Sequence, residues 1–397
     1  MMSVWSSLVG QGDAVAKLSE AAASARAIVA SRASSAARED ARSMSHAWLI
    51  TGPPGSGRSV AARAFAAALQ CTGEEVGCGT CPGCRTTMGR TNADVLFAAT
   101  ETSIINVETA RSLVLQAQSS PSQGLWRVIV VEDADRLGEA GANALLKAIE
   151  EPPEHTVWLL CAPSPEDMIA TIRSRCRHLG LRIPTASAVA DLLVREGVAT
   201  PEVALEAARA AQSHIGLARA LAADPEMRAR RRAIVTAPVS VRSVGEAVLA
   251  ADRLLETAKA QADAQVSERN AREKAELLRQ LGMEEDERAT KASRTLIRQL
   301  EEDQKRRSKR ALTDAIDRAL IDLLAIYRDV LMTQVGGDGE LINTDLADLV
   351  RSIAAESTPR QTLSRVDHIE TARRRLKSNG NTLLVLEDMA ISLRPQA

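Results

Sequence analysis

A glycine-rich turn at residues 52–59 has the residue types and spacing of a phosphate-binding loop. It reads Gly-Pro-Pro-Gly-Ser-Gly-Arg-Ser between an apolar stretch and a helical pattern, the context that the Gly-x-x-x-x-Gly-Lys-[Ser/Thr] motif requires. Gly52, Gly55 and Gly57 let backbone N–H groups point at phosphate oxygens, and the start of a helix favours negative charge. Ser59 is placed to ligate Mg²⁺, so the turn predicts a site for ATP or ADP with Mg²⁺.

Two departures from this pattern count against turnover. Arg58 stands where the motif has lysine, and a planar guanidinium does not replace a compact ammonium between the terminal phosphates without adjustment. A second apolar stretch ends in Glu132 and then Asp133, whereas P-loop ATPases place Asp first to hold Mg²⁺ and Glu second to polarise water. We therefore expect weak or absent ATP hydrolysis, while nucleotide binding stays open.

Four of the six cysteines fall within fourteen residues, in the pattern C-x6-C-x2-C-x2-C. The four are Cys71, Cys78, Cys81 and Cys84. Overlapping C-x-x-C turns present three thiolates to one tetrahedral ion, and the first cysteine closes the site. Four thiolates leave no open position, so the pattern predicts a structural Zn²⁺, with redox chemistry or coincidence as the alternatives. Cys161 and Cys176 stand alone and are expected to be small core residues.

The elements that must position these residues alternate between strand and helix. Short apolar stretches at 47–51, 128–131 and 157–161 predict buried parallel strands. Helices are predicted at 11–43, 59–69, 107–118 and 143–150. The alternation predicts an α/β sandwich up to about residue 180, and after Pro184 only helices are expected.

Residues 226–335 are predicted to be almost continuously helical. The portion 256–311 is highly charged and contains a single glycine, Gly282, so two long helices joined near that residue are expected. Such a charge run is typical of a solvated helical arm, and a basic surface that binds a partner or DNA is the alternative.

Composition excludes several function classes. Lysine and arginine together number 50 and aspartate and glutamate 51, giving a net charge of −1 and no global basic field toward nucleic acid. Residues 1–10 lack the basic and apolar regions of a signal peptide, and no apolar stretch is long enough to span a bilayer. A cytoplasmic location is therefore expected.

Several motifs, together with a zinc insertion after the P-loop helix, resemble the bacterial clamp-loader subunits of the AAA+ class. The motifs are Val9-Gly10-Gln11, His46-Ala47-Trp48-Leu49, Asn143-Ala144-Leu145-Leu146-Lys147, Glu150-Glu151-Pro152-Pro153 and Ser174-Arg175-Cys176. The resemblance implies an α/β P-loop AAA+ domain over 1–182 with the zinc module at 71–84. It further implies a small helical lid domain over 183–235 and an all-α collar domain for oligomerisation over 236–397, enlarged by the charged extension at about 256–311.

The resemblance also implies roles for individual residues. Arg175 would be an arginine finger that reaches a neighbouring subunit's ATP, although from the residues alone it could equally belong to a surface basic turn. Arg219 would be the lid arginine that senses the phosphates. A threonine or asparagine that active members place after a later strand is missing, because residues 161–164 read Cys-Ala-Pro-Ser.

Departure at the nucleotide residues with retention of Arg175 resembles the delta-prime branch of this family in bacterial DNA polymerase III. That implies a scaffold subunit within a hetero-oligomeric ring of motor ATPase and delta subunits. The ring would load the sliding clamp on primed DNA during replication, as part of a DNA polymerase holoenzyme. An active ATPase motor subunit of the same machine, or a DNA-repair AAA+ ATPase, are the alternatives.

Overall fold

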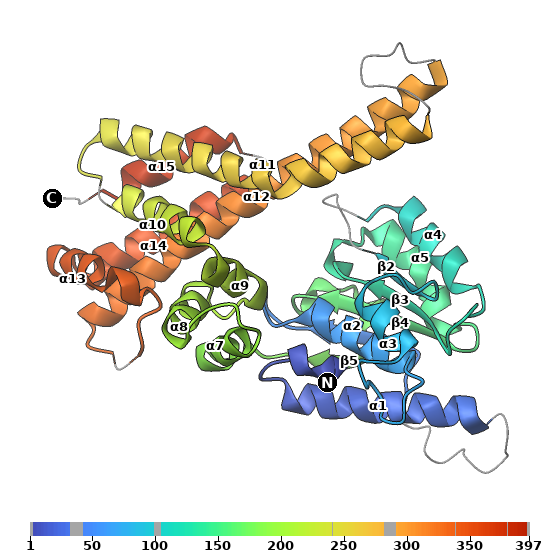
Figure 1. Cartoon of the computed structure of the whole chain (residues 1–397). Helices are drawn as coiled ribbons and strands as arrows, with labels where there is room; N and C mark the ends of the chain where they lie inside the picture. Colours follow the sequence, from blue (N-terminus) through green and yellow to red (C-terminus); the bar gives the residue numbers. More distant parts are fainter. Residues whose placement is uncertain are drawn as a thin grey trace. The chain divides into compact units, whose positions relative to one another are not determined.

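The computed structural model describes residues 3–31, 43–98, 105–239, 241–281, 291–337, 339–378 and 380–394. The chain divides into two compact units, Met1–Arg219 and Ala220–Ala397, and each is described by itself (Figure 1). The first is an α/β unit and the second contains only helices among its described residues. A parallel α/β core followed by a helical C-terminal region, as the sequence predicts, is therefore confirmed.

The first unit is built on a five-stranded parallel sheet. Its strands are β1 (Ala47–Thr51), β2 (Val95–Ala98), β3 (Arg127–Val131), β4 (Thr156–Ala162) and β5 (Arg177–Gly180). Their order across the sheet is β2-β3-β4-β1-β5. The two strands that end in the P-loop and in the acidic pair, β1 and β3, both pair with β4. Because all strands are parallel, their carboxyl ends lie on the same side of the sheet, and the P-loop and the acidic pair lie there together.

Helices cover both faces of this sheet. They are α1 (Gly12–Ser31), α2 (Arg58–Leu69), α3 (Pro82–Met88), α4 (Val107–Ala117), α5 (Glu139–Glu150) and α6 (Ala170–Arg173). Three further helices follow the sheet in the chain, α7 (Ala186–Arg195), α8 (Pro201–Ala210) and α9 (Ile215–Ala223), and α7 packs against α8. Alternate strand residues face α1 and α2 on one side, as Trp48 and Ile50 do, and α4 and α5 on the other, as Leu49 does. All five residues of β1 are buried, which explains why the central strands read as unbroken apolar runs.

Two strands have no counterpart in the sequence prediction, namely β2 and β5 at the two edges of the sheet. In β5 only Leu179 is buried, whereas Arg177 and His178 are exposed, so the strand lacks the apolar run of a central one. The predicted helix over 11–43 is α1, which ends at Ser31, and residues 32–42 lie outside the described part of the chain. Edge strands are set by pairing with a neighbour more than by their own composition.

A buried carboxylate fixes the loop between α4 and β3. Asp94 accepts backbone N–H groups of Ser122 at 2.7 Å, Gln123 at 2.7 Å and Gly124 at 2.6 Å, and it lies 3.5 Å from the Arg127 guanidinium. Burial raises the pKa of Asp94, but these hydrogen bonds outweigh it and hold the pKa below its ordinary value. The ionised carboxylate is therefore a stabilising part of this unit.

Replacing Asp94 with alanine is expected to lower the free energy of unfolding by about 2–4 kcal/mol, because three backbone donors lose their buried acceptor. A carboxylate with a depressed folded pKa stabilises above its unfolded pKa of about 3.9, and that contribution is lost as pH falls through the folded value. The difference in the free energy of unfolding between wild type and D94A, measured by urea titration, should therefore become smaller below about pH 4. Asp167→Ala removes an exposed carboxylate and is the control; equal effects of the two substitutions would contradict the assignment.

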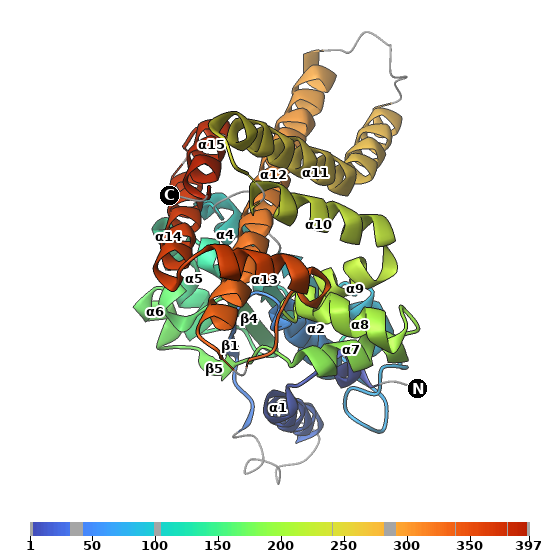
Figure 2. The same ribbon diagram turned by 90° about the vertical axis from the view of Figure 1, so that its left-hand side faces the viewer.

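The second unit is a helical bundle. Its helices are α10 (Pro225–Val239), α11 (Val244–Gln280), α12 (Lys291–Gln334), α13 (Ala347–Glu356), α14 (Pro359–Lys377) and α15 (Thr382–Ser392). Figure 2 shows α10, α11, α13 and α14 arranged around α12, whose Leu320, Leu323 and Ile326 are fully buried. Two long helices are present as predicted, and their join near Gly282 lies outside the described residues.

The charged portions of α11 and α12 lie side by side and pair with each other. Arg307 of α12 donates to Glu273 of α11 at 2.8 Å and to Asn270 at 2.6 Å, and Gln304 donates to the Asn270 carbonyl at 2.9 Å. Much of the arm's charge is thus balanced internally, as in a solvated arm. None of the helices among the described residues combines the length and low polarity needed to cross a bilayer.

Candidate functional site

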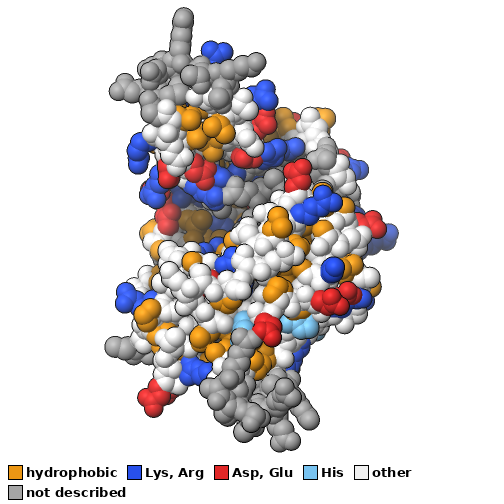
Figure 3. Space-filling model, turned by 90° about the vertical axis from the view of Figure 1, so that its right-hand side faces the viewer, with side chains coloured by type: hydrophobic (Ala, Val, Ile, Leu, Met, Phe, Trp, Pro, Cys, Tyr) orange, Lys and Arg blue, Asp and Glu red, His pale blue; other side chains and the backbone are white. Residues whose placement is uncertain are grey.

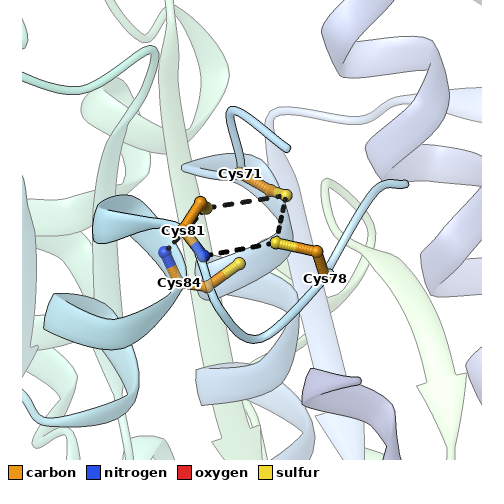
Figure 4. Close-up of side chains that lie close together, drawn as sticks. All are labelled: Cys71, Cys78, Cys81 and Cys84. Carbon is orange, nitrogen blue, oxygen red and sulfur yellow. Dashed lines mark hydrogen bonds between the residues drawn. The ribbon is translucent and has the colours of Figure 1, made fainter. Parts of the chain in front are cut away.

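The four clustered cysteines converge in space as their spacing predicts. Cys71 follows α2, Cys84 lies in α3, and Cys78 and Cys81 come from the turns between them (Figure 4). The Cys71 Sγ atom lies 3.7 Å from that of Cys78 and 3.9 Å from that of Cys81, and all four sulfur atoms lie within 4.8 Å of one another. A tetrahedral Zn²⁺ with Zn–S distances of about 2.3 Å requires sulfur separations of about 3.8 Å. The cluster therefore has the dimensions to hold a metal ion.

Backbone N–H groups point at these sulfur atoms. Cys81 N donates to Cys78 Sγ at 3.4 Å, and Cys84 N donates to Cys81 Sγ at 3.4 Å. Burial raises the pKa of Cys81, but hydrogen bonds from Cys84 and Thr72 outweigh it and lower the pKa to about 6. Hydrogen bonds from Thr80 lower the pKa of Cys78 as well. Donors aimed at sulfur favour the thiolate, which is the form that ligates metal.

The cysteine module is tied to distant parts of its unit. Arg26 of α1 donates to the carbonyls of Glu74 at 2.9 Å and Cys71 at 3.0 Å. The Gly77 carbonyl accepts from the backbone N–H of Val4 and the hydroxyl of Ser3, both at 3.0 Å. Gly77 has φ +79°, and a Cβ there would lie 2.8 Å from a Val4 methyl group, so only glycine fits this contact.

The phosphate-binding loop is present but closed upon itself. Gly57 caps α2 at φ +90°, yet the Arg58 guanidinium turns back and donates to the Gly52 carbonyl instead of facing outward. A Cβ on Gly55 would lie 2.8 Å from the backbone of His214, so residues beyond α8 lie against the loop. Ser59, the predicted Mg²⁺ ligand, occupies the first turn of α2.

The acidic strand end is engaged by a residue from the cysteine module. Arg90, just after α3, forms an ion pair with Glu132 at 2.5 Å, and its guanidinium lies 5.0 Å from the Phe97 ring. Burial raises the pKa of Cys161 at the end of β4 to about 12, and smaller effects come from the charges of Arg58, Glu132 and Asp133. These three predicted residues therefore do come together around β4, as the sheet order requires.

Arg219 is also paired within the chain. Its Nη2 donates to both carboxylate oxygens of Glu196, at 2.9 and 2.7 Å, and its Nε donates at 3.0 Å. A bidentate pair of this kind fixes the guanidinium plane against the C-terminal end of α7. The hydrogen bonds of Arg219 that the structure describes thus go to Glu196.

Arg175 lies in the turn between α6 and β5. Its Nε donates to the carboxylate of Glu150, the last residue of α5, and its Nη1 donates to the Thr171 carbonyl at 2.9 Å. The side chain remains 39% exposed, so a surface from another molecule can reach it. Two of the sequence motifs, 150–153 and 174–176, therefore meet through this ion pair.

Sequence reasoning missed the partners of the nucleotide-site residues. Arg90, Glu196 and His214 were not singled out, because each lies far along the chain from the residue it contacts and in no recognised motif. The side chains of Arg58, Glu132 and Arg219 each form a hydrogen bond within the chain.

Two segments of the chain match known protein families. Residues 30–185 match the family described as DNA polymerase III, delta subunit, and residues 287–394 match the family described as DNA polymerase III, delta subunit, C terminal. The chain belongs to the DNA polymerase III clamp-loader family. The family match therefore begins within the α/β unit and resumes in the helical unit.

Curated relatives agree with this family. The chain is 38% identical over 143 residues to the DNA polymerase III subunit delta′ of Yersinia pestis, which is 35% of this chain and 42% of that protein. It is 33% identical over 189 residues to the delta′ subunit of Escherichia coli K12, which is 47% of this chain and 57% of that protein. It is 35% identical over 162 residues to the gamma/tau subunit of Mycobacterium tuberculosis H37Rv, which is 39% of this chain and 28% of that protein. The matched part spans at most 57% of these relatives.

Proposed function

We propose that the protein is a delta-prime-like scaffold subunit of a bacterial clamp loader. It joins motor ATPase and delta subunits in a hetero-oligomeric ring, presents Arg175 to the ATP of a neighbour and so helps to load the sliding clamp on primed DNA. The proposal includes the division of the helical part into a lid over 183–235 and a collar over 236–397. It rests on the family and on one observation: Arg58 and Glu132 are engaged within the chain and partly buried, while the Arg175 side chain is 39% exposed.

Contact with DNA is proposed to come through the assembled complex. The net charge of −1 gives no overall attraction to phosphates. On the face drawn in Figure 3, charged side chains of both signs are scattered among apolar and neutral ones. A ring of subunits can supply positive charge in addition to that of this chain.

We propose that the cysteine cluster holds a structural Zn²⁺. Support comes from the sulfur separations, from the backbone donors aimed at sulfur, and from four thiolates that leave no open coordination position. The bound ion would fix the module, and through Arg26 and Arg90 it would fix the parts of the fold that these arginines contact.

The purified chain is expected to show negligible ATP turnover, because Arg58, Glu132 and Arg219 are engaged by other groups of the chain. Steady-state phosphate release, measured beside the assembled complex, tests this. Equilibrium binding of ATP and ADP to the same sample settles whether nucleotide binding survives without turnover. Turnover of order 1 s⁻¹ that Arg58→Ala abolishes would identify a motor subunit and would overturn the scaffold proposal.

A further inference from the structure

The guanidinium of Arg175 is fixed on two sides by its own chain. Nε donates to the Glu150 carboxylate, and Nη1 donates to the Thr171 carbonyl at 2.9 Å and the Ser174 hydroxyl at 3.3 Å. The Ser174 hydroxyl donates to the same Thr171 carbonyl at 3.1 Å. Nη2 has no hydrogen-bond partner among the residues that the structure describes. Two of the three guanidinium nitrogens are therefore engaged, and Nη2 remains available.

The backbone that carries Arg175 is anchored on both sides. Ile172 is fully buried before it, and Cys176 packs against the core between the sheet and α5 after it. Burial raises the pKa of the Cys176 thiol to about 12, so that side chain is a neutral anchor. The N–H of Arg175 donates to the Ile172 carbonyl at 3.0 Å. With the turn fixed, the remaining freedom at this position belongs to the arginine side chain.

That freedom has a cost when the arginine acts on another molecule. An unrestrained arginine side chain loses rotamer entropy when it binds, and fixing it beforehand lowers the cost of each contact it forms. Glu150 is suited to this because it terminates α5, where the helix dipole adds to its attraction for a cation. The pair is 39% and 40% exposed, so it contributes little to the stability of the fold. Its effect on orientation can therefore be separated from any effect on folding.

We infer that Glu150 is a positioning residue for Arg175: it accepts from Nε and leaves Nη2 to donate to the phosphate oxygens of a neighbour's nucleotide. The inference rests on the proposed finger function. Among the described residues the Glu150 carboxylate pairs with Arg175, and in this inference it acts on the neighbour's nucleotide through that arginine alone. A carboxylate at Nε and a phosphate at Nη2 use different donors of one guanidinium, so they do not compete for the same hydrogen atoms.

The test compares variants in the reconstituted complex, with the ATP sites that Arg175 does not serve inactivated. E150A is expected to lower kcat for DNA-stimulated hydrolysis by roughly fivefold and to leave the KM for ATP within about twofold. E150Q keeps an oxygen acceptor at the same place, so it should stay within about twofold of wild type. Glu151→Ala removes the adjacent exposed carboxylate and should leave both constants unchanged.

A double variant shows whether Glu150 acts through Arg175. R175A/E150A is expected to match R175A alone, because a positioning residue has no effect without the group it positions. A rise in kcat in E150A would show that Glu150 restrains the finger, and equal rates for E150A and E151A would show that it has no role; either result overturns the inference. If R175A itself leaves the rate unchanged in an intact complex, the finger function fails and the inference falls with it. If R175A lowers the rate and E150A does not, the Glu150 inference alone fails.

Discussion

Replacing Cys78 with alanine is expected to remove the bound metal and to destabilise the α/β unit strongly. Cys78 is only half-buried, so its replacement loses little packing energy, and the measured loss of stability reflects the missing metal ligand. Structural Zn²⁺ sites have apparent binding free energies of about 10–16 kcal/mol, and this binding energy stabilises the fold. The free energy of unfolding should fall by at least about 3 kcal/mol, and zinc should fall from one ion per chain to near zero. Metal analysis beside denaturant titration measures both.

Cys176→Ala provides the matched control for the metal experiment. Cys176 is also half-buried, but it lies in the other core of the same unit, away from the cluster. This variant should keep one zinc ion per chain and lose only the packing energy of one small side chain, about 1 kcal/mol. A wild-type protein that binds no zinc when supplied with it, or a C78A variant that keeps it, would refute the metal assignment.

Arg175→Ala is expected to lower the DNA-stimulated ATPase of the reconstituted complex by at least about tenfold at one site. A guanidinium brought in trans stabilises charge that develops on the transferred phosphoryl group, and alanine supplies nothing in its place. The side chain is 39% exposed and the turn is anchored by buried neighbours, so the fold should survive the substitution. Steady-state hydrolysis by the complex, with assembly confirmed by size, measures the effect.

Arg173→Ala is the control for the finger experiment. It removes an exposed arginine two positions away at the end of α6 and changes the net charge equally. A purely electrostatic role of this basic turn would lower the rate in both variants alike, whereas a finger role requires the loss to be confined to R175A. Unchanged activity of R175A in an intact complex would reject the finger role.

The central part of the fold could be predicted because its physical causes are local. Buried parallel strands such as β1 and β3 need unbroken apolar runs, and the P-loop glycines need their special backbone angles. The cysteine spacing likewise determines which sulfur atoms can meet at one ion. These signals lie within a few residues of each other and survive in the sequence.

The internal partners of Glu132 and Arg219 could not be predicted, because they lie far away in the sequence. Arg90 and Glu132 are 42 positions apart, and Glu196 and Arg219 are 23 apart. Each belongs to a chain rich in charges, so many pairings are equally consistent with the sequence. The fold selects among them by placing the residue after α3 beside the end of β3, and the end of α7 beside α9. The departures from the motif at Arg58 and Glu132 predict weak ATP turnover, but they do not indicate which residues pair with these two side chains.

The contact between Ser3, Val4 and Gly77 has a practical consequence for work on this protein. A tag or fluorophore attached ahead of Ser3 emerges beside the cysteine module, where it can obstruct metal loading or report on it. A dye at that position would sense departure of the ion as a change in its surroundings, without any alteration of the four ligands. The same geometry makes a bulky amino-terminal fusion a poor choice for purification and a small removable one preferable.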